Sequence, residues 1–364
     1  MNINILLPHK ELFEKNKLSS VSITVKNNFI HSKFKKNIKI FGQKVENPMF
    51  EKNFIGIKNP KLFYKSKNKN LAMEMCKSIK VKDLHKTIIE IHNRPFLIKL
   101  IHNKYKFFRL TLFIHNDPLE MKGSKTALER REILKIVDRV YCVSDYVKNR
   151  FLECIHKDQE KVVTLHNGIS FKNKFYKKKK LIIFVGKISY EKGAHIFVDA
   201  VNKIANIYNN WEFKLIGSSQ LGSNDLSTKY AKNVVNRFNR IGKNTEYTGF
   251  ISNEKVKEIM SHASIVVVPS LWNEPFGLVA AEAMSRGAAV ISSNLGGLKE
   301  VVGHSGVVID NIDDDNLKNE VVKLIQKKPL LKKIQKQGFN NFNFKSEDIS
   351  RKLDKFREDI FHLL

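Results

Sequence analysis

The feature that most constrains this chain is a repeated alternation of short apolar runs with segments of helical periodicity. Such runs are typical of parallel strands, because parallel neighbours need a crossover connection that a helix usually supplies. We therefore predict an α/β protein with a mostly parallel sheet and helices on both faces. The first-half runs are Ile3–Leu7, Asn37–Phe41, Ile88–Ile91, Leu110–Ile114, Val140–Val143 and Val162–Leu165, with helical segments at Val21–Phe34, Thr126–Val137 and Asp145–Glu153.

The alternation is interrupted once and then restarts. Phe171–Lys180 is basic and lacks an apolar run, which is typical of an interdomain linker; a membrane-facing basic patch is the alternative. Because 364 residues exceed the usual size of one domain, we predict two doubly wound units, 1–172 and 173–345, and a last helix at 346–364. The later strands are predicted at Leu181–Val185, Phe213–Ile216, Ile265–Val268, Ala288–Ile291 and Gly306–Ile309, and the helices at Ala194–Tyr208, Glu254–His262 and Leu278–Met284.

The charge of the chain points to a polyanionic partner. A net charge of +29 suits nucleic acid, an anionic membrane or a phosphate-rich ligand. A compositional bias is the alternative, because lysines are scattered along the whole chain among many Asn and Ile residues.

Cysteine usage and hydropathy favour a cytosolic protein. The three cysteines, Cys76, Cys142 and Cys154, give neither a disulfide framework nor a zinc pattern, which fits a reducing compartment. No run of about 18 apolar residues occurs, so no transmembrane helix is expected. The N-terminal apolar run is too short for a signal peptide.

The first candidate site follows the strand predicted at Leu181–Val185. Gly186 ends this run, Lys187 and Lys192 follow, and Gly193 precedes a helix. A loop that leads from the carboxyl end of a strand to a helix is a natural anion site. Two ammonium groups there could hold a diphosphate. The alternative is a solvated loop in a lysine-rich protein.

The second candidate site lies in Pro269–Met284, where a strand runs into a loop and then a small-residue helix. Gly277 and Leu278 would offer backbone N–H groups at the start of this helix, which suits a phosphate. Glu282 lies about one turn into the helix and can reach a ligand at that end. Glu274, on the preceding loop, is a second acceptor for sugar hydroxyls, or simply an acid that complements the helix dipole.

Both stretches resemble a large family, the retaining glycosyltransferases with the two-Rossmann GT-B fold, often called family 4. Glu274 and Glu282 have its E-x7-E spacing, and the run EPFGLVAAEAMSRGAAVISSNLGGLKEVVG is similar to the family almost position by position. The GKISYEKG loop, VDRVYCVS at Val137–Ser144 and the run His166–Ile169 are similar too. The resemblance spans roughly residues 110 to 310 and implies two Rossmann-like domains with a cleft between them.

The resemblance also implies roles for these residues. Lys187 and Lys192 would hold the donor diphosphate, and Lys187 stands where the family more often has arginine, so charge is kept but the bidentate fork is lost. Glu274 would accept hydroxyls of the donor sugar, and Glu282 would bind the ribose. The other donor-binding residues implied are Gly186, Phe276, Gly277 and Leu278, with Phe250 and Ile251 lodging the base.

In the N-terminal half, His115 follows an apolar strand at the place where the family has a histidine near the donor sugar. A structural strand-end histidine is the alternative. The catalytic candidates are thus His115, Lys187, Lys192 and Glu274.

The acceptor candidates lie in the same half. His92 and Arg94 end the preceding strand; Arg94 could contact an acceptor phosphate or merely stabilise a turn. Many relatives have a Gly-Gly loop after the first strand, but here His9–Ser20 takes its place, with Ser19 and Ser20 nearest the helix. This departure weakens the resemblance in the region that meets the acceptor.

The implied enzyme is a retaining hexosyltransferase. The N-terminal domain would bind a saccharide or lipid-linked acceptor, the C-terminal domain would bind the nucleotide-diphosphate sugar, and the last helix would pack back on the N-terminal domain. No Asp-x-Asp metal site is evident, so no cofactor or metal is expected, and the lysines would replace a divalent ion. Cell-envelope polysaccharide or lipopolysaccharide synthesis, in the cytoplasm or at the inner face of an anionic membrane, fits these features.

Three other classes remain as alternatives. The E-x7-E spacing and the lack of a cofactor-lysine signature argue against a phosphorylase or a nucleotide-sugar epimerase. A nucleic-acid-binding protein would show a basic face with interleaved aromatic residues and known motifs, and the sequence shows neither, so no nucleic-acid partner is expected. A catalytically silent GT-B scaffold would not need to keep the lysines and glutamates.

Overall fold

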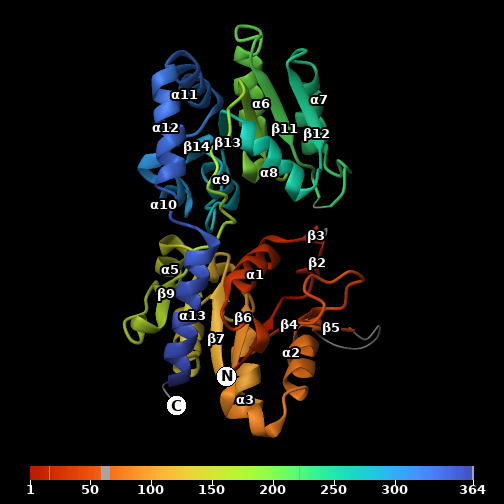
Figure 1. Cartoon of the computed structure of the whole chain (residues 1–364), viewed down its shortest axis with the longest axis vertical. Coiled ribbons are helices and arrows are strands. Elements are labelled where there is room, and N and C mark those ends of the chain that lie inside the picture. Colours follow the sequence, from red (N-terminus) through yellow and green to blue (C-terminus); the bar gives the residue numbers. More distant parts are fainter. Residues whose placement is uncertain (16, 59–65, 221, 363–364) are drawn as a thin grey trace. The chain divides into compact units, whose positions relative to one another are not determined.

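A computed structural model describes residues 1–15, 17–58, 66–220 and 222–362. The chain forms two compact units (Figure 1). Unit 1 is Met1–Gly168 together with Phe344–Leu364, and unit 2 is Ile169–Asn343. The predicted limit at residue 172 therefore falls inside unit 2, and the predicted limit at residue 345 falls inside the last segment of unit 1.

Unit 1 is built on a seven-stranded parallel sheet with the order β5-β4-β1-β6-β7-β8-β9. Its strands are β1 (Asn2–Leu6), β4 (Ile38–Gln43), β5 (Phe54–Ile57), β6 (Thr87–His92), β7 (Arg109–Ile114), β8 (Arg139–Cys142) and β9 (Val162–Thr164). The six predicted strands are present, but β5 was missed. As an edge strand β5 is only partly buried, so it lacks the continuous apolar signature. A small hairpin, β2 (Phe13–Glu14) with β3 (Lys17–Leu18), forms a separate two-stranded sheet, and Phe13 is buried in the core of unit 1.

Helices cover the sheet of unit 1. They are α1 (Ser20–His31), α2 (Lys67–Lys77), α3 (Phe96–Lys104), α4 (Ala127–Ile136), α5 (Asp145–Leu152) and α13 (Ser346–His362). Thr126 and Glu129 form a reciprocal capping box that fixes the start of α4, as the sequence pattern at this point favours. The C-terminal helix α13 returns to unit 1 and packs beside α1 (Figure 1).

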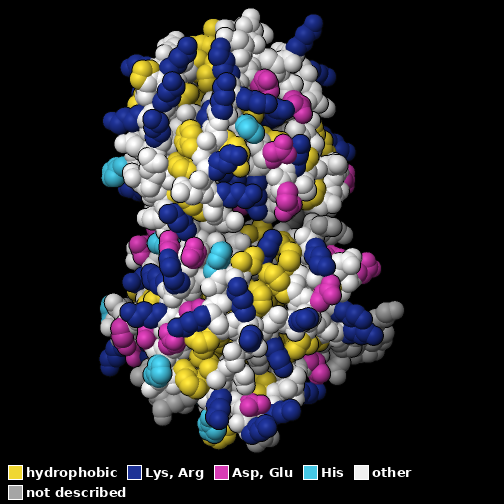
Figure 2. Space-filling view, viewed as in Figure 1, with side chains coloured by type: hydrophobic (Ala, Val, Ile, Leu, Met, Phe, Trp, Pro, Cys, Tyr) yellow, Lys and Arg dark blue, Asp and Glu magenta, His cyan; other side chains and the backbone are white. Residues whose placement is uncertain are grey.

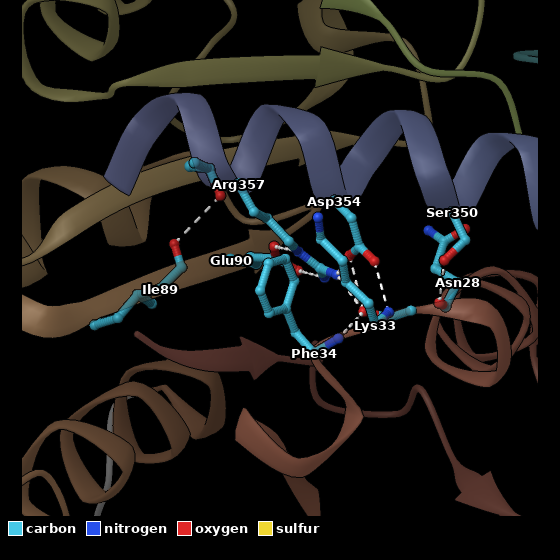
Figure 3. Close-up of polar contacts among 10 residues, drawn as sticks. Asn28, Lys33, Phe34, Ile89, Glu90, Ser350, Asp354 and Arg357 are labelled. Carbon is cyan, nitrogen blue, oxygen red and sulfur yellow. Dashed lines mark hydrogen bonds and ion pairs between the residues drawn. The ribbon is translucent and has the colours of Figure 1, made fainter. Parts of the chain in front are cut away.

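A buried ionic network ties α13 to the sheet. The Arg357 guanidinium points from α13 toward Glu90 on β6 and also bonds Asp354 (Figure 3). Its Nε and Nη2 donate to the two Glu90 carboxylate oxygens at 2.7 and 2.8 Å, and Nη1 lies 2.9 Å from Asp354 Oδ1. Asp354 in turn accepts from the Ser32 hydroxyl at 2.8 Å, just after α1. Every charge is therefore paired, as burial of ions requires.

Unit 2 is built on a six-stranded parallel sheet with the order β12-β11-β10-β13-β14-β15. The strands are β10 (Leu181–Val185), β11 (Glu212–Ile216), β12 (Thr245–Gly249), β13 (Ile265–Val268), β14 (Ala289–Ser293) and β15 (Val307–Ile309). The helices are α6 (Ala194–Ile204), α7 (Lys229–Asn239), α8 (Asn253–His262), α9 (Leu278–Met284), α10 (Leu298–Val302), α11 (Asp314–Gln326) and α12 (Lys328–Asn340). One apolar core includes Phe184, Phe197 and Phe213.

The basic segment Phe171–Lys180 contains no helix or strand, but it packs on unit 2 instead of linking the units as an open tether. The Phe171 ring stacks on Phe342 with centroids 5.6 Å apart, and the Phe175 ring meets Phe339 edge-on at 5.3 Å. Aromatic side chains in the segment therefore make it part of the domain.

The surface charge is dispersed. On the face shown in Figure 2, lysine and arginine side chains are spread over both units among acidic side chains. No helix in the described parts of the chain is long and apolar enough to cross a membrane.

Candidate functional site

Strand order places the candidate site in unit 2. The order reverses between β10 and β13, which are neighbours although two strands separate them in sequence. In open parallel sheets, ligands bind beyond the carboxyl ends of the strands at such a switch point. The loop after β10 carries Lys187 and Lys192, and the loop after β13 carries Glu274, so the sequence candidates flank this point.

Glycines let the two loops approach each other. Gly193 has a φ of 65°, and a Cβ there would lie 1.8 Å from the carbonyl oxygen of Pro269, just after β13. Gly217, with a φ of 132°, lies against the Gly186 carbonyl in the same way. Any larger residue would push the loops apart, because both the φ and the contact exclude a side chain.

Lys192 and Glu274 meet across this approach. Lys192 Nζ lies 2.5 Å from Glu274 Oε1, and the Ser270 hydroxyl donates to the same oxygen at 2.7 Å. Lys192 Nζ also lies 4.8 Å from the centre of the Trp272 ring. No hydrogen bond from the described residues reaches Glu274 Oε2, so this oxygen can accept from a ligand. Ser270 and Trp272 were not singled out from the sequence, since neither belongs to the E-x7-E pattern.

Lys187 is the outer cation of the site. Its side chain is 55% exposed and lies 3.6 Å from the Glu191 carboxylate, four residues further along the chain. Such an exposed ion pair is weak, so an incoming anion can recruit the Lys187 ammonium at little cost. The structure thus places both predicted lysines on one loop, with Lys192 buried more deeply than Lys187.

The loop before α9 holds Glu274 rigidly. The Gly297 N–H donates to the Glu274 carbonyl at 2.6 Å, and Gly296 packs so closely on Glu274 that a Cβ would lie 2.2 Å from its carbonyl oxygen. Gly277 has a φ of 102° and starts α9, which has only seven residues. Phe276 is buried, and Leu278 is half-buried.

Glu282 lies on α9, where burial raises the pKa of its carboxyl group and the nearby Lys257 and Arg286 charges oppose the rise. The Arg286 side chain bonds the Glu282 backbone carbonyl at 3.1 Å. Within the described residues the Glu282 carboxylate accepts no hydrogen bond, so it is available to a hydroxyl group.

At the position predicted to bind the nucleotide base, a side chain of the protein already accepts one hydrogen bond. Phe250 follows β12, and its backbone N–H donates to the Asn224 side-chain oxygen at 2.5 Å. Asn224 therefore accepts the hydrogen bond of a main-chain N–H that, by the resemblance, would contact the nucleotide base. No sequence motif pointed to Asn224. Ile251 follows and is half-buried.

Unit 1 has its own switch point, between β1 and β6. His92 is the last residue of β6, and His115 follows β7. His92 Nδ1 lies 2.8 Å from His115 Nε2, and the His92 ring stacks on Phe113 at 4.4 Å. Burial lowers the pKa of His115 to about 4 and lowers the pKa of His92 well below its usual value. The structure therefore pairs a predicted catalytic residue with a predicted acceptor residue.

Two of the other acceptor candidates, Ser19 and Arg94, lie near Glu11. The Ser19 hydroxyl donates to the Glu11 carboxylate. Burial raises the pKa of that carboxyl group, and Ser19 and the Arg94 charge oppose the rise. Arg94 Nη1 also donates to the Asn93 carbonyl at 2.6 Å. Ser20, the first residue of α1, is exposed. Glu11 was missed because its loop carries no recognisable motif.

Within the described ranges, no cluster of three or more His, Cys, Asp or Glu side chains could hold a metal ion.

The second half of the chain is similar to known proteins. Residues 167–341 match the family described as Glycosyl transferases group 1. The match contains Gly186, Lys192, Glu274 and Glu282, so the motifs that suggested the resemblance lie within the family region.

Relatives extend the similarity beyond that region. The chain is 28% identical over 247 residues to glycosyltransferase MJ1178 of Methanocaldococcus jannaschii, which covers 66% of the chain. It is 22% identical over 260 residues, 66% of the chain, to lipopolysaccharide 1,2-N-acetylglucosaminetransferase of Salmonella typhimurium. In both cases the chain spans 64% of the relative, which is less than two thirds of its length.

A solved structure supports the fold over the whole chain. HepE of Anabaena, solved with UDP and glucose, superposes with a TM-score of 0.75 at 17% identity and covers 98% of this chain and 99% of HepE. The predicted fold class, two Rossmann-like doubly wound domains of the GT-B type, is confirmed.

Proposed function

We propose that this chain is a retaining glycosyltransferase that moves a hexose from a nucleoside-diphosphate sugar to a saccharide or lipid-linked acceptor. The observation that carries the proposal is the cluster of Lys192, Glu274 and Ser270 at the switch point of unit 2. It offers a cation for phosphate oxygens and a fixed carboxylate for sugar hydroxyls a few ångströms apart. The family match over residues 167–341 supports the same reading.

The lysines would act on the leaving group. As the bond between the anomeric carbon and the phosphate oxygen breaks, negative charge grows on the diphosphate. Lys192 has three N–H donors and uses one on Glu274, so the others can reach a phosphate oxygen. Lys187 adds a second charge. Preorganised cations of this kind favour the transition state, and in this proposal they do so without a metal ion.

The two carboxylates would orient the donor. Ser270 and Lys192 fix Glu274 through Oε1, which leaves Oε2 for a hydroxyl of the hexose. The Glu282 carboxylate would accept from the ribose hydroxyls. Gly186, Gly277 and Leu278 would approach the phosphates through their backbone, and Phe250 and Ile251 would meet the base once Asn224 gives up its hydrogen bond.

Unit 1 would provide the acceptor side. His115 would contact the transferred sugar, while Arg94, Ser19 and Ser20 would bind the acceptor. In the retaining step, the acceptor oxygen bonds the anomeric carbon on the face that the phosphate leaves, and the acceptor proton passes to the departing phosphate oxygen. No protein nucleophile is needed in this scheme.

The biological setting is also a proposal. The relatives include the Salmonella lipopolysaccharide transferase and a protein from the cps region of Klebsiella pneumoniae, which supports a role in envelope polysaccharide synthesis. A net charge of +29 supports cytoplasmic action with peripheral contact to an anionic membrane. Co-sedimentation with anionic but not neutral vesicles at low salt is the expected result.

The function is tested by supplying UDP-, GDP- and ADP-linked hexoses with simple saccharides and measuring nucleoside diphosphate release. The wild type should consume donors of one nucleotide, and Lys192→Met should lower kcat by about a hundredfold, the usual loss for one transition-state donor. Lys318→Met is a matched control, because Lys318 has similar exposure (30% against 28%) and also pairs with a carboxylate. Equal turnover by the wild type and Lys192→Met would refute the assigned role.

A further inference from the structure

The His92–His115 pair has one hydrogen bond and two possible directions. Either His92 Nδ1–H donates to His115 Nε2, or His115 Nε2–H donates to His92 Nδ1. The low pKa values keep both rings neutral near pH 7, so each ring carries one N–H. The direction therefore decides what the other nitrogen of His115, Nδ1, can offer a ligand.

The surroundings of the second His92 nitrogen favour one direction. His92 Nε2 is buried and has no hydrogen-bond partner among the described residues. If this atom carried the proton, a buried N–H would be left unpaired. Burial is the main cause that lowers the pKa of His92, and the His115 and Arg357 charges add to it. A buried N–H without an acceptor is costly, so the proton belongs on Nδ1, where it faces His115.

The backbone around the pair is fixed. The His115 N–H donates to the Asn93 side-chain oxygen at 2.8 Å, and the Asn93 N–H donates to the Phe113 carbonyl at 2.8 Å. The His92 ring lies nearly parallel to Phe113, at 12°. These contacts hold both rings in place without a ligand, so the hydrogen bond is preorganised.

We propose that His92 is a positioning residue that holds His115 in the Nδ1–H tautomer, so that His115 presents a hydrogen-bond donor to a ligand oxygen. His92 itself is 1% exposed and does not reach a ligand, whereas His115 keeps 8% of its surface exposed. This replaces the prediction that His92 lines the acceptor site. The identity of the oxygen, a hydroxyl of the donor hexose, rests on the proposed function; the tautomer does not.

The chemistry that follows is specific. A neutral Nδ1–H donates to a hydroxyl or phosphate oxygen but cannot remove its proton, because its lone pair at Nε2 is taken by His92. His115 would therefore orient the sugar and would not serve as the general base. The retaining scheme, in which the leaving phosphate takes the proton, is consistent with this division of roles.

The tautomer is tested by long-range proton–nitrogen NMR of the full chain labelled with ¹⁵N-histidine at pH 7. The His115 signals are assigned from their loss in His115→Asn. A predominantly Nδ1–H pattern for His115 supports the proposal; a predominantly Nε2–H pattern overturns it. This measurement needs no substrate, so it stands even if no donor is found and the proposed function fails.

Kinetics with the identified donor then separate positioning from simple structural support. His92→Phe keeps the stack on Phe113 but has no donor, and kcat should fall about tenfold while the dissociation constant of the nucleoside diphosphate is unchanged. His92→Asn restores an N–H close to the position of Nδ1 and should recover most of the loss. Failure of Asn to perform better than Phe, with both variants folded, contradicts the role.

Discussion

Replacing Arg357 by methionine should strongly destabilise unit 1. Arg357 is 1% exposed and its partners Glu90 and Asp354 are 2% and 5% exposed, so the substitution leaves two carboxylates in a dry site. Three of its charge-assisted hydrogen bonds, at 2.7, 2.8 and 2.9 Å, are lost at once. Removing one partner of a buried ion pair costs about 3–5 kcal/mol, and two stranded charges place this case toward about 5 kcal/mol.

The chain offers a matched control on the same helix. Arg351 also pairs with an aspartate three residues earlier, Asp348, but both side chains are exposed. Exposed pairs contribute little, so Arg351→Met should leave the unfolding midpoint almost unchanged. Comparing the two substitutions on α13 thus separates the free-energy cost of leaving buried carboxylates unpaired from the cost of losing an arginine side chain.

Urea unfolding can be assigned to the units because both tryptophans, Trp211 and Trp272, lie in unit 2. Tryptophan emission reports unit 2, and far-UV circular dichroism reports both units. In Arg357→Met the dichroism transition should move to lower urea much further than the emission transition. A free-energy loss below about 1 kcal/mol, or one equal to that of Arg351→Met, would refute the reasoning.

Three further outcomes follow from the structure. Gly193→Ala should cost more than about 2 kcal/mol in urea unfolding, because both its φ and a carbonyl contact exclude a Cβ; Gly222→Ala, with positive φ but open space, should cost only about 1 kcal/mol. In the folded protein burial lowers the pKa of His115 to about 4, so on acidification the unfolded chain protonates this ring first. The free energy of unfolding should therefore fall between pH 6.5 and pH 4, and it should fall less steeply in His115→Asn. Ser270→Ala removes a donor to Glu274 and should raise the donor-sugar KM roughly tenfold without changing nucleoside diphosphate affinity; equal KM values would contradict the assigned role.

Much of the fold could be predicted because buried parallel strands have continuous apolar sequences. β10 reads Leu-Ile-Ile-Phe-Val and is recognised from its sequence alone. β5 reads Phe-Ile-Gly-Ile and β12 reads Thr-Glu-Tyr-Thr-Gly, and both are partly exposed edge strands without such a run. The interior strands were therefore predictable, as were the edge strands β9 and β15, whereas the edge strands β5 and β12 were not.

The candidate site was predictable where a motif names the residue. Lys192 and Glu274 were found from their loops, but their 2.5 Å contact depends on the approach of two loops 82 residues apart. The His92–His115 hydrogen bond likewise depends on the pairing of β6 with β7. Partners such as Ser270 have no sequence signal of their own, because their role comes from register and loop packing.

The central claim is that unit 2 binds a nucleoside diphosphate through Lys192, and isothermal titration calorimetry of UDP, GDP and ADP tests it most directly. One nucleotide should bind the wild type and Lys318→Met equally and bind Lys192→Met at least about tenfold more weakly, the loss expected for one charged hydrogen bond. If no nucleotide binds the wild type, or if Lys192→Met binds as tightly as the wild type, the assignment of this site is contradicted.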